Sequence, residues 1–214
     1  FNFILAAVIF TGVNLSRGQM QEPLAVGAVK DLPAAGYTLQ PGDEILAVAG
    51  IDTPDFADGV AWAAFEDSIP VEKVLEYRVS RNGQETIAQG PYLTPSIVTG
   101  VAPRSAASDA GLREGDVIVA VDGEEIFAFS HLKERVETGA GEPLELTVWN
   151  KGQTRDLILS PRRTDEPTAE GGFQTNWRIG IAGGLAFDPA RESVSPLAAV
   201  GQGVTQVWIM IEQS

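Results

Sequence analysis

The sequence contains no cysteine and only one histidine, His131, in its 214 residues. Without cysteine the chain cannot form a disulfide, a thiolate nucleophile or a Cys-ligated zinc or iron–sulfur site. A single histidine cannot supply both ligands of an HExxH zinc motif. The sequence also lacks the Gly-x-Ser-x-Gly motif that positions a nucleophilic serine. We therefore predict a binding module, with no catalytic residue and no metal site in residues 1–214.

Basic residues are scarce as well. The 15 Lys and Arg residues face 29 Asp and Glu residues, which gives a formal net charge of −14. Binding to a phosphate backbone needs clustered cations that displace counterions, and the only adjacent basic pair is Arg162-Arg163. Nucleic acid is therefore not expected as a partner.

Both ends of the chain are apolar. Residues 1–13 (FNFILAAVIFTGV) would form a helix about 20 Å long, which is too short for a hydrocarbon layer of about 30 Å. We predict that they are the end of a transmembrane helix, a buried first strand or helix being the alternative. Residues 188–214 are expected to be a linker and the start of the next membrane-directed segment. Few Lys or Arg residues flank these segments, whereas cytoplasmic loops are usually rich in them, so the intervening chain is expected to face outward.

An internal repeat organises the rest of the sequence. Residues 40–51 (QPGDEILAVAGI) resemble residues 113–124 (REGDVIVAVDGE), and residues 81–84 (RNGQ) resemble residues 150–153 (NKGQ). The order of these matches is the same in both halves. We therefore predict two copies of one domain, at residues 14–94 and 95–187.

The repeated segments have the residues of tight turns followed by strands. Gly42 and Gly115 can adopt positive φ, and the aspartate that follows each can accept hydrogen bonds from neighbouring backbone N–H groups. Asn82-Gly83 and Asp122-Gly123 are typical of two-residue hairpin turns. Strands are predicted at residues 75–80, 86–88, 144–149 and 156–159.

Two short helices are predicted in the second copy. The first, within residues 105–111, would have Ser105 as N-cap and Gly111 as its left-handed stop. The second would run over residues 131–138 with Ser130 as N-cap. Its counterpart in the first copy is residues 57–65, with Val60 and Ala64 on the inward face. Residues 162–177, rich in Gly, Thr and acidic residues, are expected to be a mobile loop.

The motif SAASDAGLREGDVIVAVDG at residues 105–123 resembles that of circularly permuted PDZ domains associated with bacterial proteases. The segments NFILA at residues 2–6, GIDTPDF at 50–56 and PLAAVGQGVTQVW at 196–208 resemble, more narrowly, the periplasmic region of RseP-type site-2 proteases. The resemblance implies a mainly β fold with short helices: two circularly permuted PDZ-like, partly open β-barrels in tandem, flanked by the ends of membrane helices.

The resemblance also implies a function. The parent protein would be an intramembrane zinc metalloprotease of the inner membrane, which cuts a membrane-spanning anti-sigma factor after another protease has trimmed its periplasmic part. Its zinc ligands would lie outside this chain. The PDZ pair would sit on the periplasmic side, over the parent's own membrane domain, and would exclude bulky substrates.

A PDZ groove lies between a helix and a strand edge, and binds the C-terminus of a peptide through the backbone N–H groups of a loop. The residues of the second copy that would form this groove are Ile179, Gly180 and Ile181 for the loop, and Leu132 and Val136 for the helix wall. An ordinary strand over residues 178–181 is the alternative.

Two further residues are candidates for contact with a bound peptide. His131 would bond a ligand hydroxyl, or would be an exposed residue at the start of the helix. Arg178 would add positive potential near the ligand carboxylate, or would be a solvent-facing strand residue.

The first copy departs from this pattern. Residues 90–93 (GPYL) occupy the place of its loop, and Pro91 lacks the N–H that a carboxylate needs. Asp58 and Glu66 add negative charge near its helix. We therefore predict weak or absent peptide binding by the first copy, whose role would be steric.

Two other functions remain open at this point. The chain could be the PDZ pair of a trypsin-like periplasmic serine protease. It could also belong to a membrane-tethered adaptor of a secretion system, without enzymatic activity.

Overall fold

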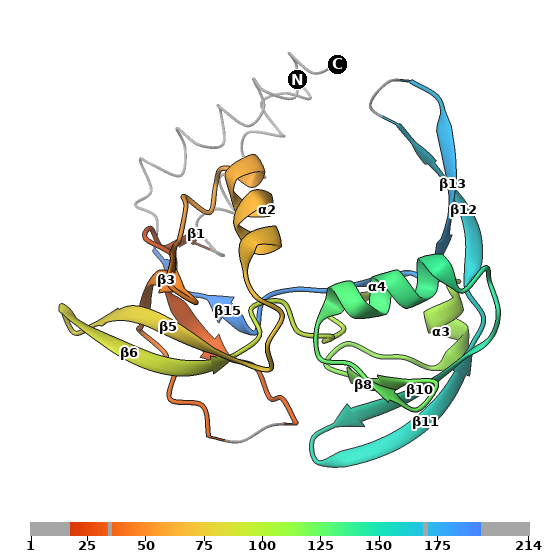
Figure 1. The fold of residues 1–214 in the computed structure, drawn as a ribbon, viewed down its shortest axis with the longest axis horizontal. Helices are drawn as coiled ribbons and strands as arrows, with labels where there is room; N and C mark the ends of the chain where they lie inside the picture. Colours follow the sequence, from red (N-terminus) through yellow and green to blue (C-terminus); the bar gives the residue numbers. More distant parts are fainter. Residues whose placement is uncertain (1–17, 34–35, 169–170, 194–214) are drawn as a thin grey trace, which may run out of the picture.

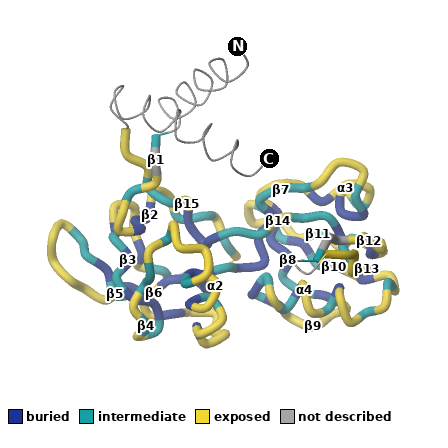
Figure 2. Tube along the Cα trace, turned by 90° about the horizontal axis from the view of Figure 1, so that it is seen from above, coloured by how far each residue is buried: buried dark blue, intermediate teal, exposed yellow. Residues whose placement is uncertain are grey.

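The computed structural model describes residues 18–33, 36–168 and 171–193. Their strands and helices form two groups, each around its own hydrophobic core (Figures 1 and 2). Residues 1–13, and residues 194–214 of the predicted linker and membrane-directed segment, lie outside the described residues. Among the described residues, no helix has both the length and the apolar character needed to cross a bilayer.

The first unit combines a four-stranded antiparallel sheet with one helix and short strands from both ends of the described chain. Its sheet has the order β4-β3-β5-β6. Its elements are β1 (Gln19–Met20), β2 (Val26–Val29), β3 (Glu44–Val48), β4 (Ile51–Asp52), α2 (Gly59–Ser68), β5 (Val74–Arg81), β6 (Gln84–Pro91), β15 (Phe187–Pro189) and β16 (Arg191–Glu192).

The second unit repeats this plan, with a four-stranded sheet of order β11-β10-β8-β9. Its elements are β7 (Gly100–Val101), α3 (Ala106–Ala110), β8 (Val117–Val121), β9 (Glu124–Glu125), α4 (Phe129–Thr138), β10 (Leu144–Asn150), β11 (Gln153–Leu159), β12 (Arg162–Pro167), β13 (Phe173–Arg178) and β14 (Ile181–Ala182). The predicted strands at residues 75–80, 86–88, 144–149 and 156–159 are confirmed within β5, β6, β10 and β11.

The repeated turns form as predicted, and each fixes a buried aspartate. Asp43 accepts a 2.8 Å hydrogen bond from the Gln40 N–H, and Asp116 accepts a 2.8 Å bond from the Arg113 N–H. Both carboxylates are fully buried, and an arginine of the hairpin pairs with each. The bond to Asp43 raises the pKa of the Arg81 guanidinium. Each aspartate therefore ties its turn to the sheet, because a buried charge needs a partner.

The helices confirm the prediction in part. Ser105 caps α3 by accepting a bond from the Ser108 N–H, and Gly111 ends it with a φ of +83°. The helix α2 starts at Gly59, after the N-cap Asp58, and buries Trp62 and Phe65. The predicted inward face was therefore wrong, and Val60 is 83% exposed. The two large aromatic side chains remove more apolar surface from water than Val60 and Ala64 would.

Residues 162–177 are also more ordered than predicted. The strands β12 and β13 pair over six residues as an antiparallel hairpin, which projects from the second unit (Figure 1). The Thr175 hydroxyl donates a 2.6 Å hydrogen bond to Asp165, and the Arg163 guanidinium lies over the Trp177 ring at 5.7 Å. These cross-strand pairs stabilise a hairpin that the glycine- and acid-rich sequence did not indicate.

The chain returns to the first unit after it has completed the second. The strand β15 pairs with β2, and β16 pairs with β1. Phe187 of β15 is fully buried in the first core. The Ala186 N–H donates a 2.8 Å bond to the Leu93 carbonyl, so the chain leaves and re-enters the first unit at adjacent points. The second unit is therefore inserted between β6 and β15 of the first. The domain boundaries predicted at residues 94 and 187 remain a prediction. They do not include the return of the chain to the first unit.

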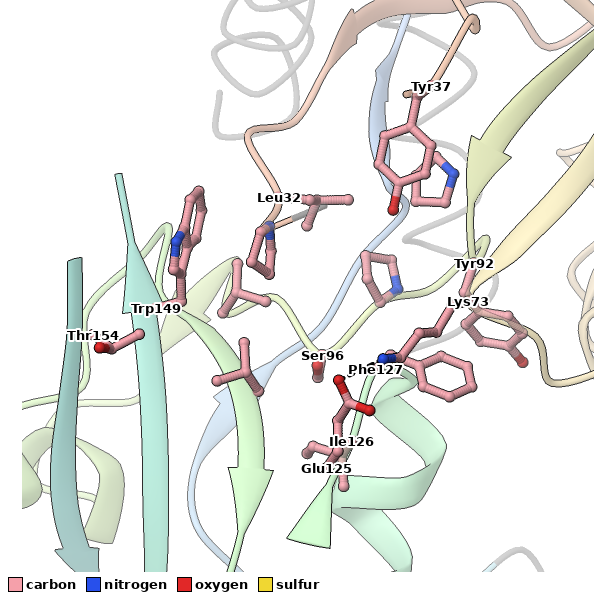
Figure 3. Close-up of a pocket in the computed structure, with 15 residues that line it drawn as sticks. Leu32, Tyr37, Lys73, Tyr92, Ser96, Glu125, Ile126, Phe127, Trp149 and Thr154 are labelled. Carbon is pink, nitrogen blue, oxygen red and sulfur yellow. Dashed lines mark hydrogen bonds and ion pairs between the residues drawn. The ribbon is translucent and has the colours of Figure 1, made fainter. Parts of the chain in front are cut away.

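A hollow of about 250 Å³ lies where the two units meet (Figure 3). Tyr37 and Tyr92 line it from the first unit, and Phe127 and Trp149 line it from the second. Lys73 and Glu125 form an ion pair across the junction, but both side chains are largely exposed, so the pair contributes little to stability. Packing holds the junction more firmly, since Ala128, just before α4, is buried in the first core.

Candidate peptide-binding site

A groove of about 300 Å³ lies in the second unit, between α4 and the chain that enters β14. Six of the seven residues predicted for a peptide site line it together. Its lining consists of Phe129, Leu132, Lys133, Val136, Arg178, Ile179, Gly180 and Ile181. The hollow is therefore apolar along its walls and has one lysine and one arginine beside it.

The helix wall follows from the spacing of α4. Leu132 and Val136 are four residues apart, so they lie on one face, and they are 1% and 4% exposed. The predicted cap Ser130 is wrong, because α4 begins at Phe129 after Ala128, which makes no side-chain capping bond. Burial of Ala128 in the first core fixes this end of the helix instead of a cap.

His131 does not line the groove. It is the third residue of α4, and its ring meets the Phe127 ring edge-on at 5.2 Å. It lines a different hollow, with Glu124, Glu134 and other residues. The later start of the helix in the sequence-based prediction had placed His131 at its first position.

The loop residue Gly180 has a φ of +82°, which strongly favours glycine. A Cβ atom at this position would lie only 2.3 Å from the Ser105 Cβ atom. The loop is held on that side by the backbone, because the Ala107 N–H donates to the Ile179 carbonyl and the Ala102 N–H donates to the Gly180 carbonyl, at 2.8 and 2.9 Å.

The N–H groups of this loop are free to bind a ligand. Across residues 18–33, 36–168 and 171–193, no backbone oxygen accepts a bond from the N–H of Ile179 or Gly180. Ile181 lies opposite Val101, next to the hydrogen-bonded pair of Gly180 and Ala102. Because such pairs alternate along an antiparallel ladder, the Ile181 N–H points away from β7. Successive N–H groups of this kind form a concave site for an anion.

The two cations of the groove differ in their partners. Arg178, at the end of β13, forms an ion pair with Glu137 of α4. Lys133 is exposed, and within the described part of the chain it forms no ion pair. Arg178 is thus held against the helix, whereas the Lys133 ammonium group is available to a ligand.

The counterpart of this loop in the first unit is residues 185–187, and not the predicted residues 90–93. The Lys30 N–H donates a 2.9 Å bond to the Ala186 carbonyl, as the Ala102 N–H does to Gly180. Phe187 pairs with Val29, as Ile181 pairs with Val101. Gly90 and Pro91 instead belong to β6, where they pair with β5.

This counterpart has lost the features of an anion site. The Ala186 N–H already donates to the Leu93 carbonyl. The side chains of Leu185, Ala186 and Phe187 are 9%, 0% and 0% exposed. On the helix side Trp62 packs edge-on against Phe56, with ring centroids 4.5 Å apart. Apolar side chains therefore fill the place that the groove occupies in the second unit.

The described residues offer no group of three or more His, Cys, Asp or Glu side chains that could hold a metal ion. This segment provides backbone N–H groups that can donate hydrogen bonds, and they lie beside an apolar wall.

Comparisons with known proteins agree with this geometry. A family model described as PDZ domain matches residues 97–150. A protein of Rhizobium meliloti that carries the name of a zinc metalloprotease is 32% identical over 123 residues, which are 57% of this chain and 33% of that protein. The regulator of sigma-E protease RseP of Salmonella typhimurium is 30% identical over 183 residues, or 75% of this chain and 40% of that protein.

Zinc metalloprotease RasP of Geobacillus kaustophilus is 25% identical over 122 residues, which are 57% of this chain and 26% of that protein. The chain thus spans well under half the length of these relatives. The predicted fold class is confirmed, with sheets that are partly open and do not close into a barrel in the described residues. Residues 97–150 therefore match a PDZ domain, and the chain as a whole is similar to a segment of proteins named RseP or zinc metalloprotease.

Proposed function

We propose that this chain is the regulatory PDZ pair of an intramembrane zinc metalloprotease, and that its second unit binds the C-terminus of a peptide. The observation that carries the proposal is the groove beside α4. There Ile179, Gly180 and Ile181 line an apolar hollow. The N–H groups of Ile179 and Gly180 have no backbone partner in the described residues, and the N–H of Ile181 points away from β7.

Binding would proceed by strand addition. A peptide lies antiparallel to β14, its terminal carboxylate accepts hydrogen bonds from the loop, and its last side chain enters the apolar hollow. Leu132 and Val136 of α4 form the wall of this hollow. A carboxylate at the end of a main chain exists only where a protein ends or has been cut. The groove would therefore distinguish a trimmed substrate from an intact one.

We further propose that the parent protein sits in the inner membrane and makes the second cut in a membrane-spanning anti-sigma factor. The name of the Salmonella relative, a regulator of sigma-E protease, supports this assignment. In this proposal the parent's membrane domain holds the zinc, and this segment lies over it on the periplasmic side. Relatives named as zinc metalloproteases favour this reading over a serine protease or a secretion adaptor.

The first unit would act by steric exclusion and would not bind a peptide. Ala186 uses its N–H within the fold, and Trp62 and Phe187 occupy the interior beside it. The first unit would narrow the path to the active site of the parent protease, so that a substrate with a large folded domain could not enter.

We expect the full chain to bind a short peptide that ends in valine or leucine with a free carboxylate. The same peptide with a C-terminal amide should bind at least about tenfold more weakly, because a hydrogen bond to a charged group contributes roughly 1.5–3 kcal/mol. Isothermal titration calorimetry with the two peptides measures the difference. Equal affinities would show that the loop does not hold the carboxylate, and would refute the proposed mode of binding.

A further inference from the structure

The groove of the second unit is short. Its loop end is open to a carboxylate, but its other end is closed by Phe129, the first residue of α4. The Phe129 ring lies directly on the backbone of Gly183, since a Cβ atom at Gly183 would be 2.6–2.8 Å from three ring carbons. A peptide that enters at Gly180 must therefore leave the groove after its last few residues. On leaving, it passes the exposed side of α4.

Lys133 lies on this exit path. It is on the same helix face as Phe129, Leu132 and Val136, and it contributes to the lining of the groove. Its neighbour one turn ahead, Glu137, is already paired with Arg178. Glu137 therefore does not compensate the charge of Lys133.

The sign of this charge contrasts with that of the chain. The formal net charge is −14, so the chain as a whole repels an acidic peptide. At the groove, however, Lys133 of α4 and Arg178 at the end of β13 both line the hollow. An acidic side chain just before the terminal residue of a ligand would lie within reach of Lys133, whereas a basic one would be repelled.

We propose that the groove selects C-termini in which an apolar last residue is preceded, within two positions, by Asp or Glu, and that Lys133 is the residue that recognises the acid. This inference rests on the proposed peptide binding and specifies its ligand. The apolar walls select an apolar last residue of the peptide, and the loop binds its terminal carboxylate. Lys133 selects an acidic residue just before the last one.

Fluorescence anisotropy with the 214-residue chain and three labelled peptides tests the inference. All three end in valine with a free carboxylate. The first has Glu before the valine, the second has Gln there, and the third has Gln there and Glu six residues upstream. We expect the first peptide to bind about threefold more tightly than the other two, and the advantage to shrink in 0.5 M salt.

The variant Lys133→Gln should bind all three peptides alike. Lys151→Gln is the matched control, since Lys151 is an exposed lysine in the turn between β10 and β11, and it should keep the preference. If the wild-type chain binds the three peptides equally, or if Lys133→Gln keeps the preference, the inference is wrong while peptide binding stands. If none of the peptides binds, the proposed function fails together with the inference.

Discussion

Replacement of Gly180 by alanine is expected to weaken binding of a C-terminal peptide by more than tenfold. The new Cβ atom would lie 2.3 Å from the Ser105 Cβ atom and 2.9 Å from its Oγ atom, so the loop has to move. Alanine at a φ of +82° adds a conformational cost of roughly 1–2 kcal/mol. Because the proposed binding of a carboxylate needs the N–H groups of residues 179–181 in their present arrangement, a shifted loop should no longer match a carboxylate. Calorimetry with the free-carboxylate peptide measures the loss.

Two further variants separate this effect from a general loss of stability. Gly152→Ala introduces a residue at a φ of +83° with no atom within 4 Å of its Cβ, so it carries the backbone strain without the collision. It should bind peptide normally. Adding Ser105→Gly to Gly180→Ala removes the colliding side chain and should restore part of the affinity. Undiminished binding by Gly180→Ala would contradict the assignment of the loop.

A chain that ends at residue 94 is expected not to fold cooperatively, although it contains the whole first repeat. It lacks β15, and with it Phe187, which is fully buried in the first core. Truncation of a buried Phe to Ala alone costs about 3–5 kcal/mol, which is much of the stability of a small domain. Trp62 is the only tryptophan in residues 1–94. Its fluorescence during urea denaturation therefore reports on the first unit alone.

The matched variant keeps residues 1–95 and 184–193 and joins them through a short glycine-serine linker. The 2.8 Å bond between the Ala186 N–H and the Leu93 carbonyl shows that the two ends are adjacent, so a short linker suffices. This variant should unfold in a single cooperative transition. A cooperative transition of the chain that ends at residue 94 would show that β15 is not needed, and would refute the inserted arrangement.

The sequence predicted best what neighbouring residues determine. The turns at Gly42 and Gly115, the bonds of the aspartates that follow them, and the caps of α3 depend on a few residues each, and all are confirmed. The face of α2 was wrong because the positions of Val60 and Ala64 fit a helical stripe as well as those of Trp62 and Phe65. Only the packing against the first core distinguishes the two.

The loop of the first unit could not be found by continuing along the first repeat, because it lies after the second. A signal was nevertheless present in the sequence. The segment Leu185-Ala186-Phe187 follows Ile179-Gly180-Ile181 by six residues, with the same order of large, small and large side chains. Its meaning depends on the long-range pairing of β15 with β2, which local patterns do not reveal.

The sequence predicted the residues of the candidate site that belong to a known motif, and it did not predict the other residues that line the groove. Leu132, Val136 and the residues 178–181 do meet in one groove. Phe129, which closes that groove, was missed because the helix was predicted to begin two residues later, so that Phe129 lay outside it. Lys133 lay inside the predicted helix, but the apolar stripe of Leu132 and Val136 did not indicate that this lysine also lines the groove.

The most direct test of the account is a residue-level map of peptide binding on the isotopically labelled chain. Two-dimensional NMR spectra would follow the backbone amides during titration with the free-carboxylate peptide. The account predicts saturable shifts at Ile179, Gly180 and Ile181, and no comparable change at Leu185, Ala186 and Phe187. Larger shifts at the second group, or the same shifts with the amidated peptide, would contradict the claim that only the second unit captures a C-terminus.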